Sequence, residues 1–463
     1  MNSEHIQRLR AIVGESYVTQ GDDIAERFRV DVGRRYTCQP LALVRPESTA
    51  QVSEVVKVAA QLNVAVTVVG GQTGTVGGAI ARDGDIAMSL DRMSRVLEID
   101  TLSMTMTVEA GCILQLAQEA AEAEQAFLPL DLGARGTAQI GGSIGANAGG
   151  NRVVRWGMMR DMVLGLEVVL ADGTVVSGLT KMLKDNAGYN WKHLLIGSEG
   201  TLGIITRAVL RLRPLPTTRQ TALFAMGSFE QAIAVLRRLE MALGGQLSSF
   251  ELMWQDFYRT MTEAQQNFRS PPLSDQYPIY ALVEAMGNDA QGDVERMEQA
   301  VATLLDEELV SDGVFARSSG QADALWAVRE DLQWGLQGLR PFAAYDVSMA
   351  IADMPKFVAD ARARLEASLP GAVALFYGHA GDGNLHALVS VGELGPSIEH
   401  KMDEAIYGAT RSVNGSVSAE HGIGMKRRAY LSYSRSEPEL ALMRQLKLAL
   451  DPHGRLNPGK ILG

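Results

Sequence analysis

Three glycine-dense segments lie between residues 70 and 205, and they constrain the fold more than any other feature of the chain. They read GGQTGTVGGA (70–79), IGGSIGANAGGN (140–151) and IGSEGTLGII (196–205). Closely spaced glycines let a backbone approach a ligand, and their N–H groups can line a concavity for phosphate oxygens. A set of tight turns is the ordinary alternative. Three such segments close together favour a binding surface for something large and flat.

The first segment also fits a nucleotide-binding order of elements. A strand over 42–46 ends at Pro46, a helix begins after Ser48 with Gln51 three residues later, and an apolar strand over 64–69 enters the glycines. The spacing G-x-G-x-x-G and a Walker loop are both absent from the sequence, which argues against NAD. A hairpin is predicted over 164–176, with its turn at Asp172-Gly173. Because these loops carry few cationic side chains, binding would rest mainly on backbone donors.

Length and composition set the broad class. A chain of 463 residues is longer than a single hydrophobic core usually serves, so two domains are expected. Its 46% hydrophobic and 21% charged residues are typical of a globular protein. The formal charge of −11 argues against a nucleic-acid partner. Two unpaired cysteines and the lack of an apolar leader or transmembrane segment predict a reduced, cytoplasmic protein. A homodimer is the default expectation for its assembly.

Two histidines flank an Asp-Gly pair in a second functional stretch, GHAGDGNLH (378–386). Apolar runs on both sides predict a β-hairpin, and a two-residue turn at Asp382-Gly383 would place His379 directly opposite His386. Opposed Cβ atoms lie about 4.5 to 5.5 Å apart, so both imidazoles could bind one metal ion. A packed or hydrogen-bonded histidine pair is the common alternative. However, three of the chain's seven histidines fall in this stretch and in SAEHGIG (418–424).

Glu420 is the carboxylate best suited to complete the set. Two histidines and one carboxylate with an open position are the ligands of catalytic zinc, although manganese and iron also accept them. The neighbouring His421 is a candidate base for a substrate proton, with an outer-shell or helix-capping role as the alternative.

The pattern after residue 216 changes to an α+β domain. Helices are predicted near 229–243, 290–305, 321–339 and 355–369, alternating with strands near 280–284, 343–349 and 373–377. A last helix is expected over 437–450.

Six motifs in this order, GGQTGTVGGA, PLDLGARGTAQIGGSIGANAGGN, IGSEGTLGIIT, YGHAGDGNLH, SAEHGIG and LNPGKIL, resemble those of the FAD-linked D-2-hydroxy acid dehydrogenases. This family includes D-2-hydroxyglutarate dehydrogenase and the related D-lactate and glycolate dehydrogenases. The resemblance implies an α+β fold with a two-part FAD-binding domain of the vanillyl-alcohol oxidase (PCMH) type over 1–217. A substrate cap domain would cover 218–417, and a segment over 418–463 would return to the flavin.

The resemblance further implies noncovalent FAD and a divalent metal, with zinc preferred to manganese. Residues expected to contact FAD lie in the three glycine segments, in PLDLG (129–133) and near the C-terminus. They are Gly70, Gly71, Gln72, Thr73, Gly74, Thr75, Val76, Pro129, Leu130, Asp131, Gly133, Gly141, Gly142, Ser143, Gly145, Asn147, Gly200, Gly203, Ile204, Ile205 and Asn457. The metal ligands would be His379, His386 and Glu420.

For catalysis, the resemblance implies that Arg329 and Asn384 contact the substrate carboxylate and that His421 accepts the hydroxyl proton. A surface arginine and a turn asparagine are the ordinary alternatives. Electrons would leave to an acceptor such as an electron-transfer flavoprotein or a quinone. Hydroxyglutarate dehydrogenases carry a threonine and a lysine where this chain has Gln333 and Ala344. Losing a cation there favours a D-lactate-like substrate with an uncharged or small side chain over D-2-hydroxyglutarate, although Arg340 could compensate.

Three other classes fit parts of the pattern. A metal-dependent hydrolase could hold a phosphorylated substrate in the glycine loops, and it would be colourless. An FAD oxidase of the same fold could act on another alcohol without a working metal, and a chelator would not inhibit it. A flavin subunit for electron transfer alone would not need His379, His386 or Glu420.

Overall fold

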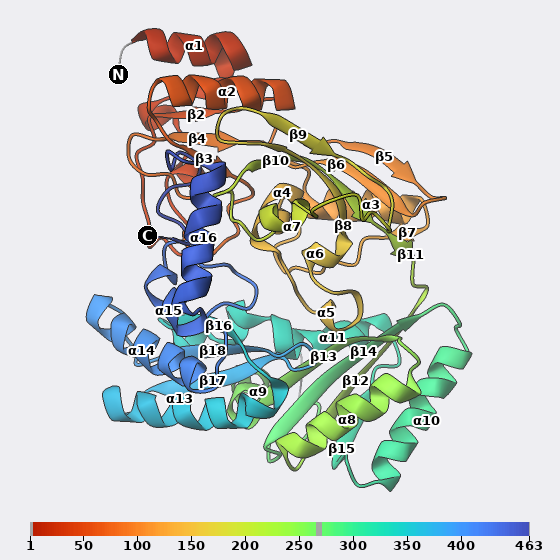
Figure 1. Ribbon diagram of the computed structural model, residues 1–463. Coiled ribbons are helices and arrows are strands. Elements are labelled where there is room, and N and C mark those ends of the chain that lie inside the picture. The colour runs from red at the N-terminus through yellow and green to blue at the C-terminus, as the bar shows by residue number, and fades with distance from the viewer. Residues whose placement is uncertain (1–2, 265–270, 463) are drawn as a thin grey trace. The chain divides into compact units, whose positions relative to one another are not determined.

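The computed structural model describes residues 3–264 and 271–462. By its contacts the chain divides into two compact units (Figure 1). Unit 1 comprises Met1–Gly149, Gly157–Leu215 and Glu420–Gly463, and unit 2 comprises Gly150–Trp156 and Pro216–Ala419. The domain boundaries predicted from the sequence, 217/218 and 417/418, lie within a few residues of these unit boundaries. The short insertion of Gly150–Trp156 into unit 2 was not expected.

Unit 1 contains a four-stranded sheet of order β1-β2-β4-β3. Its strands are β1 (Val18–Thr19), β2 (Ala42–Val44), β3 (Val66–Val69) and β4 (Ile86–Ser89), with β4 parallel to both β2 and β3. Helix α2 (Thr49–Gln61) connects β2 to β3, and the side chain of Ser48 caps it by accepting a hydrogen bond from the N–H of Gln51. α1 (Ser3–Val13) packs on α2.

A second sheet in unit 1 is antiparallel, with the order β5-β6-β10-β8-β9. The strands are β5 (Val96–Asp100), β6 (Thr105–Glu109), β8 (Val163–Val169), β9 (Val175–Gly178) and β10 (Ile204–Arg211). β8 and β9 form the expected hairpin, in which Val169 pairs with Val175. β7 (Ala126–Phe127) pairs with β11 (Arg213–Pro214). The remaining helices are α3 (Leu114–Ala123), α4 (Ile140–Ala146), α6 (Met159–Met162), α7 (Lys192–Leu195), α15 (Leu431–Ser434) and α16 (Glu437–Leu450).

The second glycine segment departs from the expected loop. Residues Ile140–Ala146 form helix α4, and the left-handed Asn147 (φ 49°) ends it. Ile140 and Ile144, one helical turn apart, are both fully buried, and Gly141 lies against Ala110, where a Cβ would come within 2.7 Å. Tertiary packing therefore outweighs the low helix propensity of glycine.

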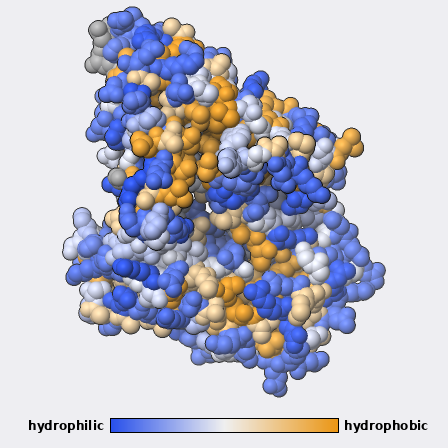
Figure 2. Space-filling view, viewed as in Figure 1, coloured by the Kyte–Doolittle hydropathy of each residue, from blue (hydrophilic) through white to orange (hydrophobic). Residues whose placement is uncertain are grey.

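The C-terminal segment returns to the N-terminal part of unit 1. Leu456 forms a parallel bridge with Val66 of β3, and Lys447 of α16 donates hydrogen bonds to the carbonyls of Leu456 and Thr201. Figure 1 shows this C-terminal segment in blue. On the visible face of unit 1, apolar residues gather in one broad area (Figure 2). α16 carries two large exposed apolar side chains, Leu442 and Leu448. No helix among the described residues is long and apolar enough to cross a membrane.

Unit 2 is built on one antiparallel seven-stranded sheet of order β15-β12-β14-β13-β17-β18-β16. The strands are β12 (Thr218–Met226), β13 (Leu247–Trp254), β14 (Ile279–Gly287), β15 (Asp312–Phe315), β16 (Ala343–Ser348), β17 (Val373–His379) and β18 (Asn384–Ser390). The helices are α5 (Val153–Trp156), α8 (Phe229–Ala242), α9 (Gln255–Ala264), α10 (Gly292–Asp306), α11 (Ser319–Glu330), α12 (Leu332–Gly335), α13 (Met354–Ser368) and α14 (Pro396–Ser412).

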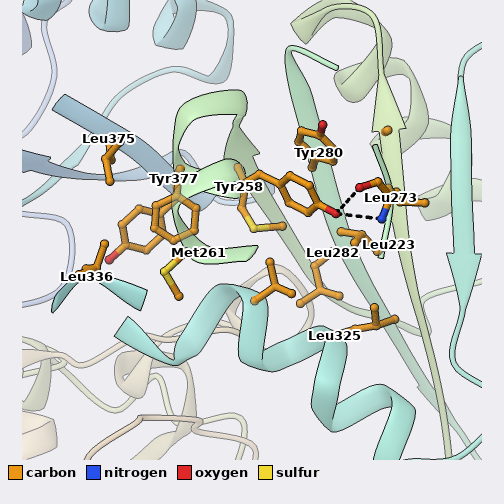
Figure 3. Close-up of a cluster of buried hydrophobic side chains, with 14 of the residues drawn as sticks. Leu223, Tyr258, Met261, Leu273, Tyr280, Leu282, Leu325, Leu336, Leu375 and Tyr377 are labelled. Carbon is orange, nitrogen blue, oxygen red and sulfur yellow. Dashed lines mark hydrogen bonds between the residues drawn. The ribbon is translucent and has the colours of Figure 1, made fainter. Parts of the chain in front are cut away.

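One face of this sheet packs against α9, α11 and α12 through a single apolar cluster (Figure 3). Tyr258 stacks on Tyr280 with ring centroids 3.7 Å apart, and its hydroxyl bonds both the N–H and the carbonyl of Leu273. Phe257 stacks on Tyr377 of β17 at 4.1 Å. Since residues two apart on a strand share a face, His379 points to the same side of the sheet as Tyr377.

The helix predicted over 321–339 is shorter in the structure. α11 ends at Glu330, Asp331 leaves the helical conformation (ψ 55°), and α12 follows. The break allows both Val328 and Leu336 to enter the same apolar cluster. Gln333 consequently lies on a different helix from Arg329.

Candidate functional site

The three glycine segments and the C-terminus converge within unit 1. A Cβ on Gly70 would lie 3.8 Å from the Cα of Gly142, so the first segment reaches α4. The third segment bonds the other end of α4, because the N–H groups of Gly197 and Glu199 donate to the carbonyls of Ile144 and Gly145. Three segments separated in sequence therefore line one region.

Asn457 joins two of these segments to the C-terminus. Its Nδ2 donates to the carbonyls of Gly78, at 3.0 Å, and of Glu199, at 2.5 Å. Glu199 was missed by the sequence analysis, although it stands beside the predicted Gly200. Its carboxylate accepts from the N–H groups of Ile423 (2.7 Å) and Gly424 (2.8 Å), and burial raises its pKa. Glu199 thus holds the returning segment against the third glycine segment.

The region has features expected of a site for a large ligand. A Cβ on Gly74, Gly142 or Gly145 would meet no atom of the described residues within 4 Å, although Gly145 itself is buried. Gln72 Nε2 and Asn457 Oδ1 are buried without a hydrogen-bond partner in the described parts of the chain. Open space beside glycines and unsatisfied polar atoms fit a bound cofactor.

The other residues predicted to contact FAD divide into two groups. Some already have structural roles: Gly71 leaves no room beside the carbonyl of Thr137, Val76 accepts from Met425 and Lys426, and Ser143 bonds the Gln139 carbonyl. Leu195 fills the space beside Gly203, and Ile204 and Ile205 pair with β8. Asp131 pairs with Arg135, and Leu130 accepts from Gln118. Thr73, Thr75 and Gly133 are partly or fully exposed, whereas Pro129 is buried.

In unit 2, the register of the histidine hairpin corrects the prediction. His386 pairs with Tyr377 rather than with His379, so residues 380–383 form a four-residue connection instead of a two-residue turn. Asp382 closes this turn, since its N–H bonds the His379 carbonyl and its carboxylate accepts from the N–H of Asn384. The ladder is shifted by two residues, and a shift of two keeps side chains on the same face. Both histidines therefore still point to one side.

Their ring nitrogens have distinct surroundings. The two Nε2 atoms face each other at 3.3 Å. His379 Nδ1 lies 2.6 Å from Oε1 of Glu251, whereas His386 Nδ1 lies 3.9 Å from Oδ1 of Asp346. Glu251 and Asp346 are fully buried and stand opposite His379 and His386 on the neighbouring strands β13 and β16. Neither carboxylate belongs to a recognisable sequence motif, so only strand pairing reveals them.

Glu420 completes a group of three side chains of the types that bind metal ions. Ligand atoms of His379, His386 and Glu420 all lie within 4.8 Å of one another. Glu420 directly follows Ala419, the last residue of unit 2, and Ser416 just upstream forms a two-hydrogen-bond bridge with Ser348 of β16. The backbone of unit 2 therefore leads Glu420 to the hairpin. His421 follows it and is exposed.

Two further predicted residues are buried in unit 2. Arg329 Nε donates to Oε2 of Glu251 at 2.9 Å, and its guanidinium lies over the ring of Tyr377, 4.5 Å from the centroid. The charges of this pair raise the pKa of Arg329 and, with His379, lower that of Glu251 against the effect of burial. Asn384 is 4% exposed, and neither atom of its amide has a partner among the described residues. Burial raises the pKa of Asp382 to about 6.

The fold matches solved flavoproteins. A crystal structure of p-cresol methylhydroxylase with substrate bound aligns with 99% of this chain and 96% of its own length at a TM-score of 0.77, with 16% identity. A domain family described as an FAD binding domain matches residues 40–178. The fold and the matched domain together define a protein with an FAD-binding domain.

Closer relatives narrow this class. A mitochondrial D-2-hydroxyglutarate dehydrogenase of Bos taurus is 37% identical over the full chain and 84% of its own length. A D-2-hydroxyglutarate dehydrogenase of Xanthomonas citri pv. viticola is 37% identical over 94% of this chain and 92% of its own. The domain described as the C-terminal domain of FAD-linked oxidases matches residues 215–461. The chain belongs to this family of FAD-linked hydroxy acid oxidoreductases, and its matched domains support FAD rather than a phosphorylated substrate as the ligand.

Proposed function

We propose that this chain oxidises a D-2-hydroxy acid to the 2-oxo acid with the help of a divalent metal. The C2 hydride would pass to flavin N5, and the hydroxyl proton would pass to a base of the protein. The observation that carries the proposal is the group of His379, His386 and Glu420 within 4.8 Å of one another in an FAD-linked oxidase. A bound metal ion would act as a Lewis acid that lowers the pKa of a coordinated hydroxyl.

The spacing of the histidines supports zinc as the first choice. Two nitrogens bound at about 2.0–2.1 Å to one tetrahedral Zn²⁺ lie about 3.3–3.4 Å apart. The two Nε2 atoms are separated by 3.3 Å. Two histidines and one carboxylate leave a position open for substrate, as in catalytic zinc sites. Manganese accepts the same ligand types and is the second choice.

Asn384 is the residue best placed to bind the substrate near this metal site. It begins β18 two residues before His386, and both polar atoms of its buried amide lack a protein partner among residues 3–264 and 271–462. Such a group is costly to bury unless a ligand satisfies it. We assign the substrate carboxylate to the amide N–H of Asn384. Arg329 would supply the positive charge, and His421 would accept the proton.

The substrate side chain has two candidates. The relatives named above suggest D-2-hydroxyglutarate as the substrate, and its second carboxylate needs a cation in the binding site. Gln333 lies on α12, apart from Arg329, and Ala344 is exposed on β16, two residues before Asp346. Neither is charged, which favours a D-lactate-like acid. An electron-transfer flavoprotein or a quinone is proposed as the acceptor, because the sequence lacks a nicotinamide fingerprint.

The decisive experiment follows anaerobic bleaching of the flavin absorbance. FAD-loaded and zinc-loaded protein is mixed with D- and L-forms of lactate, 2-hydroxyglutarate and related acids, before and after treatment with a chelator. Bleaching by D-acids alone, lost with chelator and restored by zinc or manganese, is the expected result. Bleaching that persists without metal would overturn metal assistance, and no bleaching by any acid would overturn the reaction itself.

The same assay compares the two side chains. D-2-hydroxyglutarate is expected to show a lower kcat/KM than an apolar D-2-hydroxy acid. The variant Ala344→Lys should raise kcat/KM for D-2-hydroxyglutarate alone, because it adds a cation on the face of β16 that carries Asp346. A higher kcat/KM for D-2-hydroxyglutarate in the parent protein would refute the preference for an uncharged side chain.

A further inference from the structure

A buried carboxylate that the proposed mechanism does not use connects the metal ligand His379 to Arg329. Glu251 on β13 stands directly opposite His379 on β17, and its side chain is fully buried. One carboxylate oxygen lies 2.6 Å from His379 Nδ1, and the other accepts from Arg329 Nε at 2.9 Å. Each oxygen therefore serves a different partner.

The first contact determines which histidine nitrogen is available to a metal. An ionised carboxylate only accepts hydrogen bonds, so the proton of neutral His379 must sit on Nδ1. Its Nε2 then presents a lone pair toward His386 Nε2, 3.3 Å away. A carboxylate behind a ligating histidine fixes ring orientation and raises ligand basicity. His386 Nδ1 lies 3.9 Å from Oδ1 of Asp346, whereas His379 Nδ1 lies only 2.6 Å from Glu251.

The second contact restrains the substrate-binding cation. Arg329 is 6% exposed on the last turn of α11, and its guanidinium is held between the carboxylate of Glu251 and the ring of Tyr377. Because Nε is engaged by Glu251, the orientation of the guanidinium plane is set by the same side chain that sets His379. A planar guanidinium binds a carboxylate well only in a fixed orientation.

We propose that Glu251 is a positioning residue, which holds His379 in the tautomer and orientation needed for metal binding and aims Arg329 at the same time. This inference rests on the proposed metal site. Glu251 would strengthen zinc binding through His379, and it would contribute to substrate binding through Arg329. A purely structural ion pair between Glu251 and Arg329 is the alternative, and it makes a different prediction for zinc.

The zinc affinity of the FAD-loaded protein distinguishes the positioning role from a purely structural ion pair. Zinc-free protein is titrated in zinc-buffered solution, and flavin content with thermal unfolding checks the fold of each variant. Glu251→Gln removes the charge and leaves one acceptor for two donors, so it should weaken zinc binding by about 10- to 100-fold. Arg329→Gln leaves the hydrogen bond that His379 donates to Glu251 intact, so zinc affinity should stay within about threefold of the parent while the substrate KM rises.

Glu284→Gln is the matched control. Glu284 is a buried carboxylate on the same face of the sheet, and it also bonds α11, through Trp326 Nε1 at 2.9 Å. Its loss should affect thermal unfolding without affecting zinc affinity. If Glu251→Gln does not fold, the double variant Glu251→Gln/Arg329→Gln removes both charges together and should fold with the same weakened zinc binding.

Each outcome decides the inference. Parent-like zinc affinity in folded Glu251→Gln would overturn it while leaving the metal site in place. Equal weakening by Arg329→Gln would assign the effect to the ion pair and also overturn it. A parent protein that binds no zinc would instead overturn the proposed metal-assisted function, and the positioning role with it.

Discussion

The Nε2 atoms of His379 and His386 lie 3.3 Å apart, although the two residues are not paired across the β17–β18 ladder. Tyr377 occupies the position opposite His386, so the histidines are diagonal neighbours on one face of the sheet. Diagonal neighbours are about 7–8 Å apart at their backbones, within reach of long side chains. Both rings converge because His379 lies two residues beyond Tyr377 on β17, so it shares the face of the sheet on which Tyr377 and His386 stand opposite each other.

The metal site is tested most directly by His386→Ala. Removing a ligand should weaken zinc binding by more than the about 10- to 100-fold typical of outer-shell changes, and it should slow flavin reduction by substrate. Bound zinc per protein and the anaerobic bleaching rate are the two measurements. His453→Ala, an exposed histidine of unit 1, is the control that should change neither. Full zinc content in His386→Ala would contradict this assignment.

Asn384→Ala separates a substrate contact from a structural residue. Because its amide has no partner in the described parts of the chain, its removal should not lower the thermal midpoint. A hydrogen bond to a charged group contributes about 1.5–3 kcal/mol, so substrate KM should rise by at least about tenfold. Steady-state kinetics and thermal unfolding of the same preparation provide the test. A destabilised variant with an unchanged KM would show that the amide serves the fold alone.

Gly145→Val tests whether FAD binds beside the glycine segments of unit 1. A Cβ at this helical position would meet no atom of the described residues within 4 Å, and the helix propensity of valine is not below that of glycine. Unit 1 should therefore still fold. The side chain would instead occupy the space assigned to FAD. The expected result is folded protein with a lower flavin content after purification and reconstitution. Gly320→Val on α11, where a Cβ also meets no atom within 4 Å, should retain full flavin.

Lys460 gives unit 1 a specific pH dependence. Burial lowers its pKa to about 8 from 10.5, while its Nζ donates to the carbonyls of Ile80 and Pro458. Below pH 8 both folded and unfolded chains carry the proton, so the cost of burying the charge is present in full. Between about 8 and 10.5 the unfolded chain holds more protons, and stability should therefore rise with pH.

Comparison with Lys460→Met isolates this effect from other titrating groups. The stability of the parent relative to the variant should increase by about 2 kcal/mol between about pH 7 and pH 9.5. Chemical unfolding of unit 1 followed at both pH values measures it. A difference between parent and variant that is independent of pH would show that Lys460 keeps an ordinary pKa.

Local signals in the sequence predicted many elements and the segments that carry the site. Ser48 caps α2, and the Asp172-Gly173 hairpin forms, because capping and turn chemistry depend on neighbouring residues. The face shared by the two histidines was also predictable, since side-chain direction along a strand repeats every two residues. Long-range pairing was not: the four-residue connection after His379 and the break of α11 at Asp331 depend on packing.

The sequence by itself therefore determined the glycine segments, the candidate metal ligands His379, His386 and Glu420, and the family resemblance. Only the tertiary structure decided which residues stand behind them. Glu251 meets His379 because β13 and β17 are neighbours in the sheet, although 128 residues separate them in the chain. Glu199 meets the segment after Glu420 in the same way. Strand order and loop closure set such partners, and no short-range pattern in the sequence encodes them.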